Sequence, residues 1–80
     1  MIQFYATKWC GDCHLAKGVL QDKGVAFNEI DIDEDHAAAE LVRQLNRGMY
    51  RVPTIIFDDG SRIIEPSVTE LAHKLEQMGL

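Results

Sequence analysis

The sequence is poor in cysteine and proline, with two of each among 80 residues, and it contains no long apolar run. Its apolar stretches extend over only a few residues, which excludes a helix that crosses a bilayer. Acidic residues outnumber basic ones by 13 to 8, and the net charge of -5 predicts repulsion from nucleic acid and anionic membranes. The first five residues show no basic segment followed by an apolar one, so we expect a cytoplasmic protein.

The bulk composition is that of one globular domain over residues 1–80, with 46% hydrophobic and 26% charged residues, and we expect a monomer. The two cysteines, Cys10 and Cys13, are separated by only two residues. A disulfide between them would close a loop too short to stabilise the fold appreciably. In a cytoplasmic protein this spacing, beside a strand and a helix, therefore predicts redox or metal chemistry.

Two changes of apolar periodicity predict the elements of the first half. Ile2, Phe4 and Ala6 alternate with other residues as in a strand, and from Gly11 the spacing becomes helical, with Gly24 at the end of the helix. A second strand is predicted over residues 25–32. A second helix follows the acidic residues 33–35, and it presents an apolar stripe made of Ala38, Leu41, Val42 and Leu45.

The second half predicts a hairpin and a last helix. Residues 52–57 and 62–64 are the two strands, and Asp59-Gly60 favours a two-residue type I′ turn between them. Ser67 and Glu70 have the spacing of a capping box, and the apolar stripe after it consists of Val68, Leu71, Leu75 and Met78. The order β-α-β-α-β-β-α predicts an α/β fold, with three helices on a mixed four-stranded sheet.

Cys10 is the candidate nucleophile, because a helix N-terminus stabilises a thiolate and Lys8 adds a positive charge nearby. Gly11 has no Cβ, so a disulfide can approach the sulfur closely. Cys13, one helical turn further on, is the candidate resolving thiol. Asp12 opposes the thiolate through its own negative charge.

Pro53 is the second candidate element of the site. We expect a cis Val52-Pro53 bond beside Cys10, which would leave the backbone of Val52 free to pair with an extended substrate. Arg51 is a candidate for contacting a substrate carboxylate at the rim of the cleft that contains Cys10. Trp9 is either an aromatic residue at the edge of the core or a shield beside Cys10, and the two roles are compatible.

Other chemistries use the same motif. Zinc would take both cysteines and His14, yet a fourth ligand is not evident. Cys10 to His14 also match the C-x-x-C-H pattern of haem attachment, with Met49 or Met78 as distal ligand. An iron–sulfur carrier that uses Cys10 and an external thiol is a further alternative. We expect no bound metal.

Residues 9–13 and Val52-Pro53-Thr54, in this element order, resemble the glutaredoxin-like proteins of the thioredoxin superfamily over the whole chain. The mycoredoxin type is the nearest within that group, as residues 37–40, 57–61 and 66–67 also match its pattern. The resemblance implies a disulfide oxidoreductase that reduces protein disulfides or mixed disulfides with a small thiol, such as mycothiol, bacillithiol or glutathione. Cys10 would attack and Cys13 would resolve. The residues expected to contact substrate are Lys8, Trp9, Gly11, Asp12, Arg51, Val52, Pro53 and Ser67.

The sequence departs from glutathione-using glutaredoxins at two places. These usually have Pro-Tyr between the cysteines and Gly-Gly before the last helix, where this chain has Gly-Asp and Glu65-Pro66-Ser67. Glu65 is expected to repel a carboxylate of glutathione. The alternative is a glutaredoxin-like electron donor to ribonucleotide reductase that is served by thioredoxin reductase. Either reading predicts disulfide-containing client proteins as partners.

Overall fold

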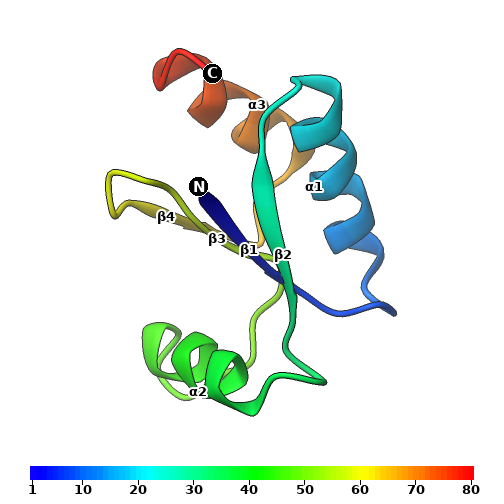
Figure 1. Ribbon diagram of the computed structural model, residues 1–80, viewed down its shortest axis with the longest axis vertical. Helices are drawn as coiled ribbons and strands as arrows, with labels where there is room; N and C mark the ends of the chain where they lie inside the picture. The colour runs from blue at the N-terminus through cyan, green and yellow to red at the C-terminus, as the bar shows by residue number, and fades with distance from the viewer.

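The computed structural model describes residues 1–80 as four strands and three helices in the predicted order. They are β1 (Ile2–Ala6), α1 (Gly11–Asp22), β2 (Phe27–Asp31), α2 (His36–Leu45), β3 (Thr54–Ile56), β4 (Arg62–Ile64) and α3 (Val68–Gln77). The strands form one sheet in the order β2-β1-β3-β4 (Figure 1). β1 is parallel to β2 and antiparallel to β3, and β3 and β4 form the antiparallel hairpin, so the predicted mixed sheet is confirmed.

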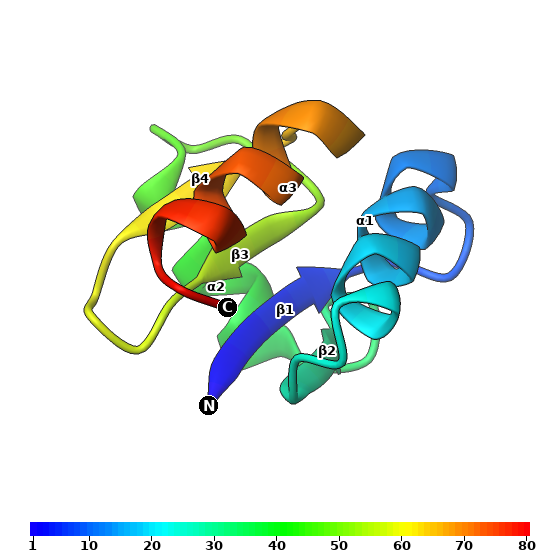
Figure 2. The same ribbon diagram turned by 90° about the horizontal axis from the view of Figure 1, so that it is seen from above.

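Helices cover both faces of the sheet. α1 and α3 lie on one face and α2 lies on the other (Figures 1 and 2). The larger core cluster is between the sheet and the helix pair, and its fully buried members include Phe4, Leu20, Ile55, Leu71 and Leu75. The smaller one lies under α2 and contains Tyr5, Ile32, Ala38 and Val42. Successive residues of β1 are therefore buried on opposite faces.

Two residues of the predicted apolar stripes are exposed. Leu41 in α2 is 37% exposed, and Val68 at the start of α3 is 46% exposed. Helical periodicity identifies the side of a helix that faces inward, but it does not say how far the neighbouring layer extends. Val42, Leu71 and Leu75 of the same stripes are fully buried, as predicted.

The predicted type I′ turn is wrong. The register pairs Ile56 with Arg62, and Phe57 donates its N–H to the carbonyl of Ser61 at 2.8 Å, which leaves three loop residues rather than two. A type I′ turn needs positive φ at two central residues, whereas only Gly60 of this loop has one, at 86°. The connection is thus a three-residue hairpin loop with glycine in its left-handed position.

Side-chain caps begin all three helices. Cys10, Asp35 and Ser67 occupy the N-cap positions, and the predicted capping box of Ser67 and Glu70 is present. Each cap satisfies a backbone N–H that has no partner within the helix. None of the three helices combines the length with the apolar character that a membrane span requires.

Candidate active site around Cys10 and Cys13

Cys10 lies at the N-cap of α1, in the short connection between β1 and this helix. Its Sγ accepts the backbone N–H of Cys13 at 3.1 Å, and its own N–H donates to the carbonyl oxygen of Thr7 at 3.5 Å. The sulfur therefore takes the place that a serine or aspartate oxygen occupies in an ordinary N-cap. A thiolate formed there meets an N–H donor and the positive end of the helix dipole.

Cys13 lies deeper in the core than Cys10. Cys13 is 2% exposed and Cys10 is 9% exposed, and both are free thiols in this structure. Burial raises the pKa of the Cys13 thiol to about 12, and its hydrogen bond with Cys10 acts in the same direction. Because a thiolate is the attacking species, Cys13 is held in the unreactive form while Cys10 is the outer sulfur.

The Val52-Pro53 segment lies beside Cys10, although 42 residues separate them. The Cys10 thiol donates to the carbonyl oxygen of Val52 with an Sγ–O distance of 3.8 Å. The Val52-Pro53 bond is cis, as predicted. Neither the N–H nor the C=O of Val52 takes part in a backbone hydrogen bond, so both have capacity left for an incoming chain.

Three hydrogen bonds hold the segment around Pro53 in place. The Thr54 hydroxyl donates to the carbonyl oxygen of Arg51 at 2.6 Å, and the amide of Asn46 donates to that hydroxyl at 3.3 Å. From β4, the N–H of Glu65 donates to the carbonyl oxygen of Pro53 at 2.8 Å. The residues on both sides of Val52 are therefore held by hydrogen bonds to the rest of the fold. The N–H of Val52 has no backbone partner, and its carbonyl oxygen accepts only the Cys10 thiol.

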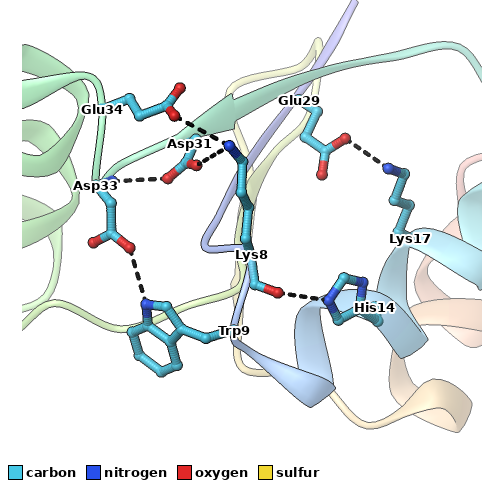
Figure 3. A network of polar contacts seen from close by, with 8 residues as sticks. All are labelled: Lys8, Trp9, His14, Lys17, Glu29, Asp31, Asp33 and Glu34. Carbon is cyan, nitrogen blue, oxygen red and sulfur yellow. Dashed lines mark hydrogen bonds and ion pairs between the residues drawn. The ribbon is translucent and has the colours of Figure 1, made fainter.

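Lys8 is engaged by carboxylates at the end of β2 (Figure 3). Its Nζ lies 3.1 Å from Glu34 and 3.9 Å from Asp31. The hydrogen bond that Lys8 donates to Glu34 raises the pKa of Lys8, and the charges of both carboxylates add to this. The sequence predicted that this ammonium would support the Cys10 thiolate, but its contacts are with the β2–α2 segment instead.

Trp9 is 74% exposed and is not part of the core. Its indole Nε1 donates to Oδ2 of Asp33 at 2.9 Å, so the ring is tethered to the segment that precedes α2 (Figure 3). The Nε2 of His14 lies 2.8 Å from the carbonyl oxygen of Lys8. No group of three or more His, Cys, Asp and Glu side chains is placed to hold a metal ion.

Gly11 and Asp12 form the exposed first turn of α1. A Cβ built on Gly11 would meet no atom within 4 Å, so the approach over this residue is open. The charge of Asp12 makes the smallest of the contributions that raise the pKa of Cys13.

Arg51 and Ser67 are bound to groups of the protein itself. Arg51 Nη1 pairs with Oε2 of Glu65 at 3.2 Å, so the acidic residue that the sequence marked as unfavourable for a carboxylate is partly neutralised. Ser67 caps α3: its hydroxyl accepts the N–H of Glu70 at 3.1 Å. The exposed pair of Arg51 and Glu65 can open for a ligand at little cost, because such pairs contribute under about 1 kcal/mol.

Sequence reasoning missed two residues that position the site, Asn46 and Asp33. Asn46 is 7% exposed and connects the end of α2, through the carbonyl oxygen of Val42 at 2.9 Å, to Thr54. For Asp33 the sequence predicts only a favourable negative charge at the start of a helix. A polar residue one helical turn after the buried Val42 was the signal that could have identified Asn46. No such signal existed for Asp33, because its partner Trp9 is 24 positions away in the sequence.

The fold and this pair of cysteines define a thiol–disulfide oxidoreductase with a thioredoxin-like fold. The family model described as glutaredoxin matches residues 2–62. A glutaredoxin of Mycobacterium tuberculosis is 42% identical over 74 residues, covering 92% of this chain and 88% of the relative. Mycoredoxin 1 of Corynebacterium glutamicum is 36% identical over 78 residues, covering 96% and 95%. The chain belongs to the glutaredoxin family.

A solved structure supports the fold independently of these alignments. The glutaredoxin-like NrdH-redoxin from Escherichia coli superposes with a TM-score of 0.75 at 25% identity, over 90% of this chain and 91% of that chain. Its name describes a glutaredoxin-like protein with a thioredoxin-like activity profile. The predicted fold and enzyme class are thereby confirmed.

Proposed function

We propose that the protein, acting as one domain over residues 1–80, reduces mixed disulfides between client proteins and a low-molecular-weight thiol. The observation that carries this proposal is the placing of Cys10 Sγ between the N–H of Cys13, at 3.1 Å, and the carbonyl oxygen of Val52, at 3.8 Å. One side stabilises a thiolate, and the other offers a peptide edge to the chain that carries the disulfide.

In the first step the Cys10 thiolate attacks the small-thiol sulfur of the mixed disulfide. The old S–S bond breaks, the client sulfur leaves as a thiolate that takes up a proton, and Cys10 carries the small thiol. The thiolate of a second small-thiol molecule then attacks that adduct. The two small-thiol molecules leave together as a symmetrical disulfide, and Cys10 is released as a thiolate.

Cys13 serves the second type of substrate, a protein disulfide. There Cys10 is bonded to the client, and Cys13 must lose its proton before it can attack the Cys10 sulfur and release the client thiolate. Burial keeps Cys13 protonated, which disfavours this step relative to attack by an exposed small thiol. The geometry thus favours the route that needs only Cys10.

Substrate contacts follow from the same geometry. The backbone of Val52 would pair with the substrate chain, Pro53 would hold that edge open, and the open face over Gly11 would admit the sulfur. Arg51 and the N-terminus of α3 at Ser67 would meet polar groups of the small thiol. Lys8 would take part only after leaving Glu34.

The test is NADPH-coupled turnover of a peptide mixed disulfide, with separate supplies of mycothiol, bacillithiol or glutathione and their reductases. Cys10→Ser should abolish turnover, and Cys13→Ser should keep a substantial part of it. Equal loss in both variants would contradict the proposed route and indicate a protein that acts only through both thiols.

A second candidate is electron donation to ribonucleotide reductase with thioredoxin reductase as the supply. The structural match to NrdH-redoxin favours it. The same assay separates the two functions, because turnover with thioredoxin reductase and no small thiol is expected only of this second one.

A further inference from the structure

A cavity of about 570 Å³ opens next to Val52, between the Trp9 loop and α2. It is separate from the sulfur atoms, since neither cysteine lines it. The lining residues that matter here are Trp9, Asp33, His36, Glu40, Tyr50 and Val52. Because Val52 belongs both to this cavity and to the proposed docking edge, a chain docked at that edge has a neighbouring side chain within reach of the cavity.

Two aromatic rings on its walls are uncovered. Trp9 is 74% exposed and Tyr50 is 61% exposed, although large aromatic side chains are usually buried. Trp9 is also held in one orientation by the hydrogen bond from Nε1 to Asp33 (Figure 3). A tethered ring facing a cavity offers a prepared surface for a cation or an apolar stem.

The charge of the cavity is negative. No lysine or arginine lines it, while two carboxylates do. That of Glu40 is bound at both oxygens by Arg43 on the same helix, so it is largely compensated. Asp33 uses only Oδ2 for Trp9, no ion pair involves it, and its other oxygen is free. His36 also lines the cavity.

We propose that this cavity receives a lysine or arginine side chain of the client protein, from a residue next to the cysteine that docks at Val52. The inference rests on the proposed function. The aliphatic stem would lie along Trp9 and Tyr50, and the charged end would meet the free oxygen of Asp33. An extended client chain supplies side chains at regular intervals along the edge, so one of them can enter while the cysteine stays at Cys10.

The experiment uses short peptides whose single cysteine carries the small thiol found to support turnover. Lysine, glutamine or glutamate is placed at each flanking position in turn, and kcat/KM is measured for the full-length protein. At one of the flanking positions lysine should exceed glutamate about tenfold, from attraction of one charge and repulsion of the other.

Asp33→Asn should lower the advantage of lysine over glutamine by about threefold to fivefold, because asparagine keeps an acceptor for Trp9 but removes the charge. Asp22→Asn makes the same change in net charge at the exposed end of α1 and should leave the advantage as it was. Tyr50→Leu should reduce the advantage, and Tyr50→Phe, which keeps the ring, should retain it.

Equal turnover of the three peptides at both positions would overturn the inference and leave the proposed function standing. The inference would also be overturned if Asp33→Asn and Asp22→Asn lowered the lysine advantage equally, because the preference would then come from the net charge of the protein and not from the cavity. A wild-type protein that turns over none of the peptides would overturn the proposed function itself, and with it this inference.

Discussion

Cys13 is expected to react very slowly with alkylating agents, and the reason is chemical as well as steric. At pH 8 a thiol with a pKa of about 12 is ionised to roughly one part in ten thousand, against roughly one part in ten at the ordinary value of 9.0. Because only the thiolate is alkylated, the difference corresponds to about a thousandfold in rate.

The Cys10→Ser variant isolates this thiol. The substitution removes the charge of a Cys10 thiolate, but burial, the largest cause, remains. We therefore expect alkylation of Cys13 by iodoacetamide to be roughly a hundredfold slower in the folded variant than in the same variant unfolded in guanidinium. The rate, followed by mass spectrometry, should keep rising tenfold per pH unit beyond pH 9.

A purely steric shield would slow the reaction too, but it would leave the pH profile of an ordinary thiol, which levels off near pH 9. Such a profile, or a folded rate within tenfold of the unfolded one, would refute the argument that burial holds Cys13 protonated. The explanation offered above for the preferred Cys10 route would then fail as well.

Three further predictions concern stability. Because folding raises the pKa of Cys13, unfolding releases the Cys13 proton between pH 9.0 and about 12. The free energy of unfolding, measured in urea titrations, should therefore fall as pH rises through this window. Relative to Cys13→Ser, the fall should reach about 1.4 kcal/mol per pH unit. Parallel pH curves for the two proteins would contradict this. Ser67→Ala removes the cap of α3 and should cost about 1 kcal/mol, lowering Tm by about 4–8 °C in calorimetry, whereas Thr69→Ala on the exposed helix surface should not lower it. Equal shifts in both variants would show that the cap contributes nothing. Asn46→Ala leaves the buried hydroxyl of Thr54 without its donor and should lower the free energy of unfolding by about 1–3 kcal/mol in the same titrations. A change of under about 0.5 kcal/mol would mean that the hydrogen bond from Asn46 to Thr54 does not stabilise the fold.

Local patterns were sufficient for the elements and for the N-cap position of Cys10. The alternation from Ile2 to Ala6, the change to helical spacing after Gly11 and the capping box at Ser67 are short-range signals, and all three elements formed where they were predicted. The N-cap position of Cys10 is equally local, because it depends on a strand ending and a helix beginning around it. These interactions connect residues a few positions apart, so a sequence displays them directly.

Contacts between distant segments decided what surrounds that thiol. Lys8 turned to Glu34 rather than to Cys10, and Trp9 was tethered to Asp33, because the end of β2 lies beside the end of β1 in the sheet. Asn46, just after α2, donates to Thr54 at the start of β3, and Leu41 of the predicted apolar stripe is 37% exposed.

The sequence by itself determined the element order, the mixed sheet and the two cysteines at the start of α1, since each rests on periodicity or on a motif. Only the tertiary structure decided that Lys8 pairs with Glu34, that Trp9 bonds to Asp33, and that an acidic cavity with two exposed aromatic rings opens next to Val52. Such placements depend on how whole elements pack. One-dimensional patterns report the inward side of each element but not which side chains of distant elements meet.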